Sequence, residues 1–142
     1  MDIWETLYNK AKQLYHPHDV SPFIYAENVV CALEADDGQI YTGYCFEATC
    51  GVFHLCAERV AAFNMYQFSK QTKVKRMIAF REAAPAGASG MPCGACREFL
   101  MELNVANAAT EIMVDYDQRE TITLGELMPK WWGLDRAKGG TE

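Results

Sequence analysis

The sequence lacks both a run of basic residues and a long apolar segment. Its 142 residues carry 13 Lys and Arg against 19 Asp and Glu, a formal net charge of −6. Such a chain has little with which to follow a phosphate backbone, so a polynucleotide partner is not expected. No apolar run approaches the roughly 20 residues of a membrane-spanning helix, and no membrane partner is expected either.

Features of a secreted protein are also missing. The stretch from Met1 to Glu5 is acidic where a signal peptide would be basic, and we therefore expect a cytoplasmic protein. The six cysteines would suggest disulfides in a secreted chain. In a reducing compartment, clustered cysteines more often bind metal or perform chemistry.

Neither an internal repeat nor a linker divides the chain. We expect one domain over residues 1–133 and a polar, frayed tail at residues 134–142. Hydrophobic periodicity and turn residues predict helices and strands in alternation. The helices are expected at 2–15, 55–68 and 94–103, and the strands at 28–34, 39–46, 73–80, 111–116 and 120–124. Alternation favours an α/β fold with a largely parallel sheet, and the Ala/Gly/Pro-rich residues 83–90 suggest a mobile loop.

The segment from His16 to Pro22 contains two prolines, so the first helix cannot continue through it. It is predicted to be a loop. His16 and His18 have the spacing of a metal-ligand pair. Histidines in a proline-broken loop are more often solvated, however, and we do not expect these two to be ligands.

Two short cysteine stretches, Cys56-Ala57-Glu58 and Cys93-Gly94-Ala95-Cys96, begin the second and third predicted helices. Helix N-termini carry partial positive charge and unpaired N–H groups, which stabilise thiolates. Three converging thiolates would bind Zn²⁺ and leave its fourth position for water, whose pKa falls when it is bound. Three protein ligands therefore indicate a catalytic zinc site.

Acidic and basic residues accompany these ligands. Glu58 is too close to the metal to be idle and is not needed as a ligand, which suits a proton shuttle. Arg59 and Arg97 are expected to offset the thiolate charge by hydrogen bonding to sulfur. An isolated Cys-x-x-Cys would equally fit a redox pair or half of a zinc ribbon, but the separate Cys-x-Glu favours the catalytic reading.

The remaining cysteines and His54 have simpler interpretations. Cys31, Cys45 and Cys50 are expected to be small buried hydrophobic residues on or near the hairpin. His54 is expected to be a helix-start residue, with metal contact as the less favoured alternative.

Together, Cys56-Ala57-Glu58 and Pro92-Cys93-Gly94-Ala95-Cys96-Arg97 resemble the zinc-dependent cytidine deaminases, specifically the small three-cysteine class that acts on free nucleosides. The resemblance runs from about Val29 to Gly133. It implies a three-layer α/β/α sandwich with a five-stranded mixed sheet, and a homo-oligomer, usually a tetramer. It also implies Zn²⁺ on the three cysteines and Glu58 as general acid and base. In the family reaction, water replaces a ring amine, which leaves as ammonia.

The chain departs from the family pattern where the sugar should bind. Members that deaminate cytidine carry Gly-x-Asn-x-Glu-Asn-Ala, in which the Asn and Glu contact a sugar hydroxyl. Here Glu47 is retained, but Cys45 replaces the asparagine, and a thiol is a poor substitute for an amide. The position of the family's tyrosine is occupied by Gly51, which predicts a wider entrance to the substrate pocket.

Three further substrate contacts follow from the resemblance. Glu27 replaces an aromatic residue that contacts the base; it would favour an amine or cation on the substrate, or it would pair with an arginine of the same subunit. Ala57 is expected to line the base site. Trp132 matches an aromatic residue that reaches a neighbouring subunit's site, with simple packing as the alternative.

The substrate stays open among several aminopyrimidine nucleosides. Cytidine or deoxycytidine is the family default, but Glu47-Ala48-Thr49-Cys50-Gly51 also resembles a bacterial type of blasticidin S deaminase. Modified cytidines and a free base remain alternatives. A third hypothesis is an inactive, zinc-stabilised oligomeric binding module, which would keep zinc yet release no ammonia. The presence of Glu58 and the lack of a fourth ligand argue against it.

Overall fold

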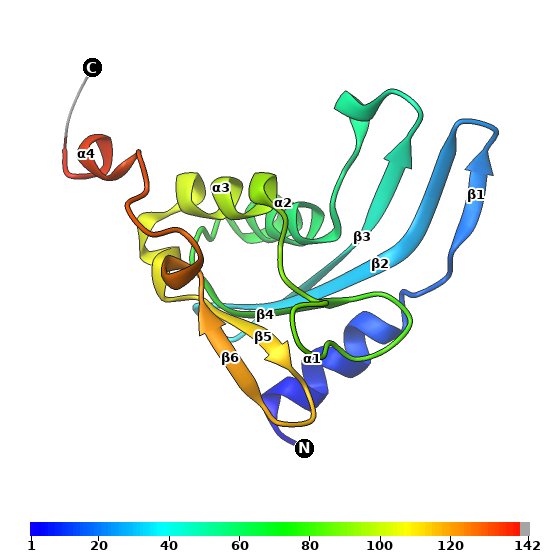
Figure 1. The fold of residues 1–142 in the computed structure, drawn as a ribbon, viewed down its shortest axis with the longest axis horizontal. Coiled ribbons are helices and arrows are strands. Elements are labelled where there is room, and N and C mark those ends of the chain that lie inside the picture. Colours follow the sequence, from blue (N-terminus) through cyan, green and yellow to red (C-terminus); the bar gives the residue numbers. More distant parts are fainter. Residues whose placement is uncertain (140–142) are drawn as a thin grey trace.

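A mixed sheet of six strands lies between two layers of helices in the computed structural model, which describes residues 1–139 (Figure 1). The helices are α1 (Ile3–Lys12), α2 (Ala57–Ser69), α3 (Gly94–Leu103) and the short α4 (Leu134–Ala137), with 3-10 turns η1 (Gly51–Phe53), η2 (Val105–Ala109) and η3 (Gly125–Leu127). The strands are β1 (His18–Ser21), β2 (Ile24–Ala35), β3 (Ile40–Ala48), β4 (Val74–Phe80), β5 (Glu111–Asp115) and β6 (Glu120–Thr123). The predicted three-layer sandwich is confirmed.

Strand β2 organises the sheet, whose order is β1-β2-β4-β5-β6 with β3 on the other edge of β2. Near its start β2 pairs with β1, and near its end it pairs with β4. Only β4 and β5 are parallel; the other strand pairs are antiparallel. The expectation of a largely parallel sheet is therefore wrong, because β3 follows β2 through a tight hairpin and β4 returns antiparallel to β2.

Strand β1, which lies between two prolines, was not predicted from the sequence. Residues His18–Ser21 form β1, where a loop was predicted. Pro17 and Pro22 flank this strand and do not interrupt it, and it lies at the edge of the sheet, where proline is tolerated. The count of five strands is thus one short.

Alternating residues of the sheet build a core on each face. One cluster packs against α1 and includes Val30, Ala32, Ile78, Phe80 and Met113. The other packs against α2 and α3 and includes Cys31, Leu33, Ala35, Met77 and Ile112. Figure 1 shows α2 and α3 on one side of the sheet and α1 on the opposite side. Of the cysteines expected to be buried, Cys31 and Cys45 are buried, whereas Cys50 in the loop before η1 is exposed.

Helix α2 lies directly on strand β3 because β3 has a glycine at the contact. A Cβ atom on Gly43 would lie 2.5 Å from the Ala61 nitrogen and 2.7 Å from the Ala57 carbonyl oxygen. Real Cβ atoms do not approach backbone so closely. Gly43 therefore fixes the distance between β3 and the first turn of α2, which carries Glu58.

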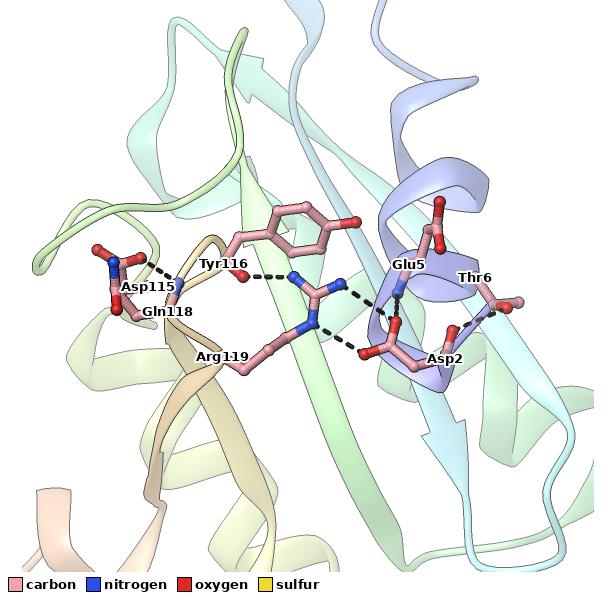
Figure 2. Close-up of polar contacts among 7 residues, drawn as sticks. All are labelled: Asp2, Glu5, Thr6, Asp115, Tyr116, Gln118 and Arg119. Carbon is pink, nitrogen blue, oxygen red and sulfur yellow. Dashed lines mark hydrogen bonds and ion pairs between the residues drawn. The ribbon is translucent and has the colours of Figure 1, made fainter.

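A polar clamp ties the start of α1 to the turn between β5 and β6 (Figure 2). Asp2 caps α1 by accepting from the Glu5 backbone N–H at 2.9 Å. The Arg119 guanidinium donates to both oxygens of the same carboxylate, at 2.9 and 3.2 Å, and also to the Tyr116 carbonyl. These hydrogen bonds lower the pKa of Asp2, and the contact with Arg119 is the largest cause.

None of the helices in residues 1–139 is both long and apolar enough to cross a membrane. Residues 134–139 of the predicted tail include the single turn α4. The last three residues of that tail, 140–142, lie outside the described part of the chain.

Candidate active site

Three cysteine sulfurs meet where α2 and α3 begin. Cys56 is the N-cap of α2, Cys93 is the N-cap of α3, and Cys96 follows within the first turn of α3. The Sγ atoms of Cys56 and Cys93 are 3.7 Å apart, and those of Cys93 and Cys96 are 3.6 Å apart. The two helix starts that the sequence predicted therefore bring the thiols to one point.

The spacing of these sulfurs fits zinc. Tetrahedral Zn–S bonds of about 2.3 Å separate two sulfurs by about 3.8 Å, close to the distances observed. Neither N-cap thiol forms a capping hydrogen bond to its helix, so both sulfurs are free to bind a metal. Among the described residues, this group includes no histidine and no fourth cysteine. The donor set therefore suits a zinc ion that keeps one position for a non-protein ligand.

The environments of the three sulfurs differ. Burial raises the pKa of the Cys96 thiol, and the charge of Glu58 adds to the effect. Burial also acts on Cys93, but the nearby backbone N–H groups at the start of α3 and the neighbouring thiols of Cys96 and Cys56 outweigh it and lower the pKa of the Cys93 thiol. Helix N–H groups thus stabilise a thiolate at Cys93, as its position at the start of α3 predicts.

Glu58 lies beside the sulfurs, in the first turn of α2. Its side chain is 7 % exposed, and its Oε1 is 3.9 Å from the Cys96 Sγ. Burial raises the pKa of this carboxyl group. A raised pKa makes the carboxyl group a better proton acceptor than an exposed glutamate, which suits acid–base catalysis.

The two predicted charge-balancing arginines behave differently. The Arg59 guanidinium donates to the Cys56 sulfur at 3.2 Å, as expected. Arg97 donates instead to the backbone carbonyls of Pro92 and Leu127, at 2.8 and 3.3 Å. Its side chain reaches back to the loop before α3 and across to η3. Arg97 therefore holds the Cys93 loop in place and forms no hydrogen bond to sulfur in the structure.

A cavity of about 390 Å³ opens beside the sulfurs and has the size of a small-ligand pocket. Cys56, Ala57, Glu58 and Cys93 are among the residues that line it. Strand β3 contributes both Cys45 and Glu47. The other lining residues are Val29, His54, Ala79, Phe80, Arg81, Ser89, Gly90 and Met91. His54 thus faces the cavity but does not belong to the sulfur group.

Asn28 is a polar residue that the motif did not reveal. Its Nδ2 donates to Glu47 Oε2 at 2.6 Å, and its Oδ1 accepts from the Cys45 thiol at 2.7 Å. Cys45 stands where the family has an asparagine. An amide group therefore lies beside Glu47 after all, but it comes from β2 and not from β3.

Glu27 faces away from this cavity. It has a left-handed backbone, with φ of 65°, at an irregularity in the pairing of β2 with β3. Its carboxylate lies near His16 and His18, and it does not line the cavity. The backbone irregularity breaks the alternation of the strand, so Asn28 turns toward Cys45 while Glu27 turns outward. No sequence signal marked this bulge.

Trp132 also lies outside the cavity of its own chain. The residue is 64 % exposed, its ring packs beside Trp131, and its indole N–H donates to Glu98 at 3.1 Å. The exposed ring is available to a neighbouring molecule, which is what the expectation of a contact between subunits requires.

The α/β/α fold and the three-thiol group beside a buried glutamate define a zinc-dependent hydrolase of the deaminase type. Residues 6–111 match the model of the cytidine and deoxycytidylate deaminase zinc-binding region, and the chain belongs to this family. It is 32 % identical over 107 residues to the cytidine deaminase of Mycobacterium tuberculosis strain H37Rv, covering 75 % of this chain and 74 % of the relative.

Solved structures agree with this assignment. The cytidine deaminase of Mycobacterium tuberculosis matches with a TM-score of 0.71 at 25 % identity, covering 94 % of this chain and 99 % of that one. The cytidine deaminase of Bacillus anthracis matches with a TM-score of 0.67 at 21 % identity, covering 97 % and 95 %. The second match concerns the fold alone.

Proposed function

We propose that the protein converts a cytosine-type nucleoside, cytidine or deoxycytidine, to the uracil-type product and ammonia. The observation that carries the proposal is the position of the Glu58 carboxyl group, 3.9 Å from a zinc-binding thiol and at the wall of a nucleoside-sized cavity. Such an activity belongs to nucleoside metabolism and suits pyrimidine salvage.

Each residue of the site has a proposed part. Cys56, Cys93 and Cys96 hold Zn²⁺, which when bound lowers the pKa of a water molecule. Glu58 takes the proton that the water releases and delivers it to the ring nitrogen next to the amine-bearing carbon. Once the water oxygen has bonded to the amine-bearing carbon, Glu58 carries the second proton of that water to the amine, and the carbon–nitrogen bond breaks to release ammonia. Arg59 stabilises the thiolate charge through its hydrogen bond to Cys56.

The far end of the cavity determines which sugar is accepted. Glu47 is positioned by Asn28 and accepts a sugar hydroxyl, while the Asn28 amide supplies the polarity that Cys45 lacks. Ala57 lines the base. Glu27 forms none of these contacts within its own chain, so its proposed effect on base recognition would need a rearrangement of β2 or a second subunit.

Blasticidin S, or another cytosine derivative whose sugar carries different groups, is the second candidate. The observation that favours it is the replacement of the family's β3 asparagine by a thiol, with an amide supplied from β2. Hydrogen-bond partners at changed positions discriminate against substrates that match the original pattern.

We propose further that the chain forms a homo-oligomer, with the tetramer of the family as the expected state. Large apolar side chains are exposed on η1 and α2, among them Phe53, Phe63 and Phe68, the last at 72 %. A monomer would leave these in water, whereas an interface would bury them. Trp132 would then reach a neighbour's cavity. The free cysteines suit the proposed cytoplasmic location.

An ammonia-release assay on zinc-loaded protein tests the proposal. We would compare cytidine, deoxycytidine, cytosine, isocytosine, N4-substituted cytidines and blasticidin S. Release from cytidine or deoxycytidine supports the first candidate, and release from blasticidin S alone supports the second. Zinc retention without ammonia from any of these compounds would support the inactive binding module and overturn the proposed activity.

A further inference from the structure

His16, His18 and Glu27 form a second group of ligand atoms, separate from the cysteines. One nitrogen of each histidine and one oxygen of Glu27 lie within 4.8 Å of one another. The backbone brings them together: His18 pairs with Ala26 in the β1–β2 ladder, and the His16 N–H donates to the Glu27 carbonyl at 3.1 Å. Neighbouring strands thus place Glu27 beside both imidazoles.

The tautomer of His18 points its free nitrogen at the carboxylate. His18 Nδ1 is 2.7 Å from the His16 carbonyl oxygen. A carbonyl can only accept, so Nδ1 carries the hydrogen, and the lone pair of a neutral ring is on Nε2. This Nε2 lies 3.7 Å from Glu27 Oε2. Two acceptors therefore face each other, and only a cation or a proton between them makes the contact favourable.

The same hydrogen bond is the one that orients histidine ligands at metal sites. A ligating imidazole usually donates its other ring N–H to a carbonyl or carboxylate, which fixes the ring and its tautomer. His18 makes this contact through its Nδ1 and the His16 carbonyl oxygen. His16 Nδ1 lies 3.9 Å from the other oxygen of Glu27, and the two rings are 4.6 Å apart.

The distances favour an ion over direct hydrogen bonds. Separations of 3.7 and 3.9 Å exceed the usual N–H···O range of about 2.7–3.2 Å. Bonds of about 2.0–2.2 Å to a shared metal would place neighbouring ligand atoms about 3 to 3.6 Å apart, which small side-chain rotations would achieve. Glu27 also keeps a left-handed backbone, with φ of 65°, which costs energy in a residue other than glycine.

From these contacts we propose that His16, His18 and Glu27 bind a first-row divalent cation at the β1 edge of the sheet. Two imidazoles and a carboxylate suit Zn²⁺ and its neighbours in the series. The site leaves positions for water, because His16 is exposed. It is independent of the catalytic proposal, because none of its three residues lines the cavity.

Zinc titration by calorimetry tests the site. Protein already holding one zinc per chain at the cysteines would be titrated with Zn²⁺ at mildly alkaline pH, where imidazoles are neutral. We expect one further zinc per chain. His18→Ala should abolish the binding of this second zinc. Glu27→Gln, which keeps the shape of the side chain, should lower the affinity for the second zinc by about tenfold or more.

The matched control is Asp19→Asn, which removes an exposed carboxylate from the same strand and should leave the binding of the second zinc unchanged. Unfolding curves would establish that each variant is folded. The proposal is overturned if the wild-type protein takes up no second zinc, or if Glu27→Gln binds the second zinc with unchanged affinity. The latter would mean that the histidines bind zinc without the predicted carboxylate.

Discussion

The amide of Asn28 bridges two residues of the neighbouring strand, and its hydrogen bond to Glu47 is the shorter side of that bridge at 2.6 Å. The Cys45 thiol completes it at 2.7 Å. Glu47 is thereby fixed in one orientation at the wall of the cavity. The motif retained the glutamate and lost the asparagine, and the structure supplies an amide from a different strand.

Asn28→Ala should raise KM for the nucleoside that the ammonia screen identifies by about 10- to 150-fold, because a hydrogen bond to a charged group contributes about 1.5–3 kcal/mol. The kcat should change much less, since the Asn28 side chain hydrogen-bonds to Cys45 and Glu47 and not to Glu58. Steady-state kinetics measure both values. Asn9→Ala, on the exposed side of α1, is the control. An unchanged KM would show that the bridge does not position Glu47 for substrate.

Glu58→Gln should lower kcat by about 10²–10⁴-fold, the usual contribution of a positioned acid–base group. The amide has nearly the same shape and cannot carry the proton. Zinc content and the unfolding midpoint should stay close to those of the wild-type protein. Ammonia release at saturating substrate gives the rate. A variant with nearly full activity would remove Glu58 from the proposed proton transfer.

Removal of any one of the three clustered thiols should reduce zinc content. Cys93→Ser is the most informative variant, because the Cys93 sulfur contacts both other sulfurs. We expect less than one zinc per chain after mild chelation, where the wild-type protein retains it, as measured by elemental analysis. Cys50→Ser changes an exposed cysteine outside the group and should keep full zinc content. Equal retention in both variants would contradict the ligand assignment.

Gly43→Ala should destabilise the fold by about 1–3 kcal/mol, the range typical of overpacking. The new methyl group would meet the α2 backbone, which cannot move without shifting Glu58. Urea unfolding measures the change. Gly51→Ala is the control, because a Cβ atom there has no neighbour within 4 Å among the described residues. Equal stability of the two variants would mean that α2 can move away from β3 at little cost.

The clamp between Asp2 and Arg119 should make stability depend on pH. Hydrogen bonds lower the pKa of Asp2 below its ordinary 3.8. Its contribution is therefore present above the ordinary value and is lost as the pH falls through the lower folded-state value. The stability difference between the wild-type protein and Asp2→Asn should shrink as the pH falls from 6 toward about 3.

Urea unfolding at several pH values measures this difference. Asp117→Asn is the control, since Asp117 lies in the same β5–β6 turn and makes no ion pair within residues 1–139. If the Asp2→Asn difference did not vary with pH, its cause would lie in helix capping by the neutral side chain rather than in the charge of Asp2.

Local spacing was sufficient to predict the sulfur group, because ligands that cap two helices are placed by the helices themselves. Hydrophobic periodicity likewise located α1, α2 and α3. The strand pairing was harder to predict, since no local pattern shows that one edge of β2 pairs first with β1 and then with β4. Arg97 was predicted to hydrogen-bond to sulfur because it is close to Cys96 in the sequence. Its long side chain reaches several backbone carbonyls, however, and it donates to two of these.

Asn28 and Glu27 illustrate the same limit at the level of one residue. Strand alternation places Glu27 on the side of Val29, which lines the cavity, and Asn28 on the other side. The left-handed conformation of Glu27 changes this: Glu27 lies beside His16 and His18, and Asn28 hydrogen-bonds to Cys45 and Glu47, while Val29 still lines the cavity. A non-glycine residue with positive φ leaves no composition signal, so the change became visible only in three dimensions.

Strand β3 contains one position that cannot be substituted without disturbing the fold, Gly43, and others that line the cavity. A Cβ atom at position 43 would collide with the α2 backbone, while Cys45 and Glu47, two and four residues further on, line the cavity. A mutational library aimed at the cavity can therefore vary Cys45, Glu47 and the Asn28 that hydrogen-bonds to both, and keep Gly43 constant, because packing and cavity lining depend on different residues of β3.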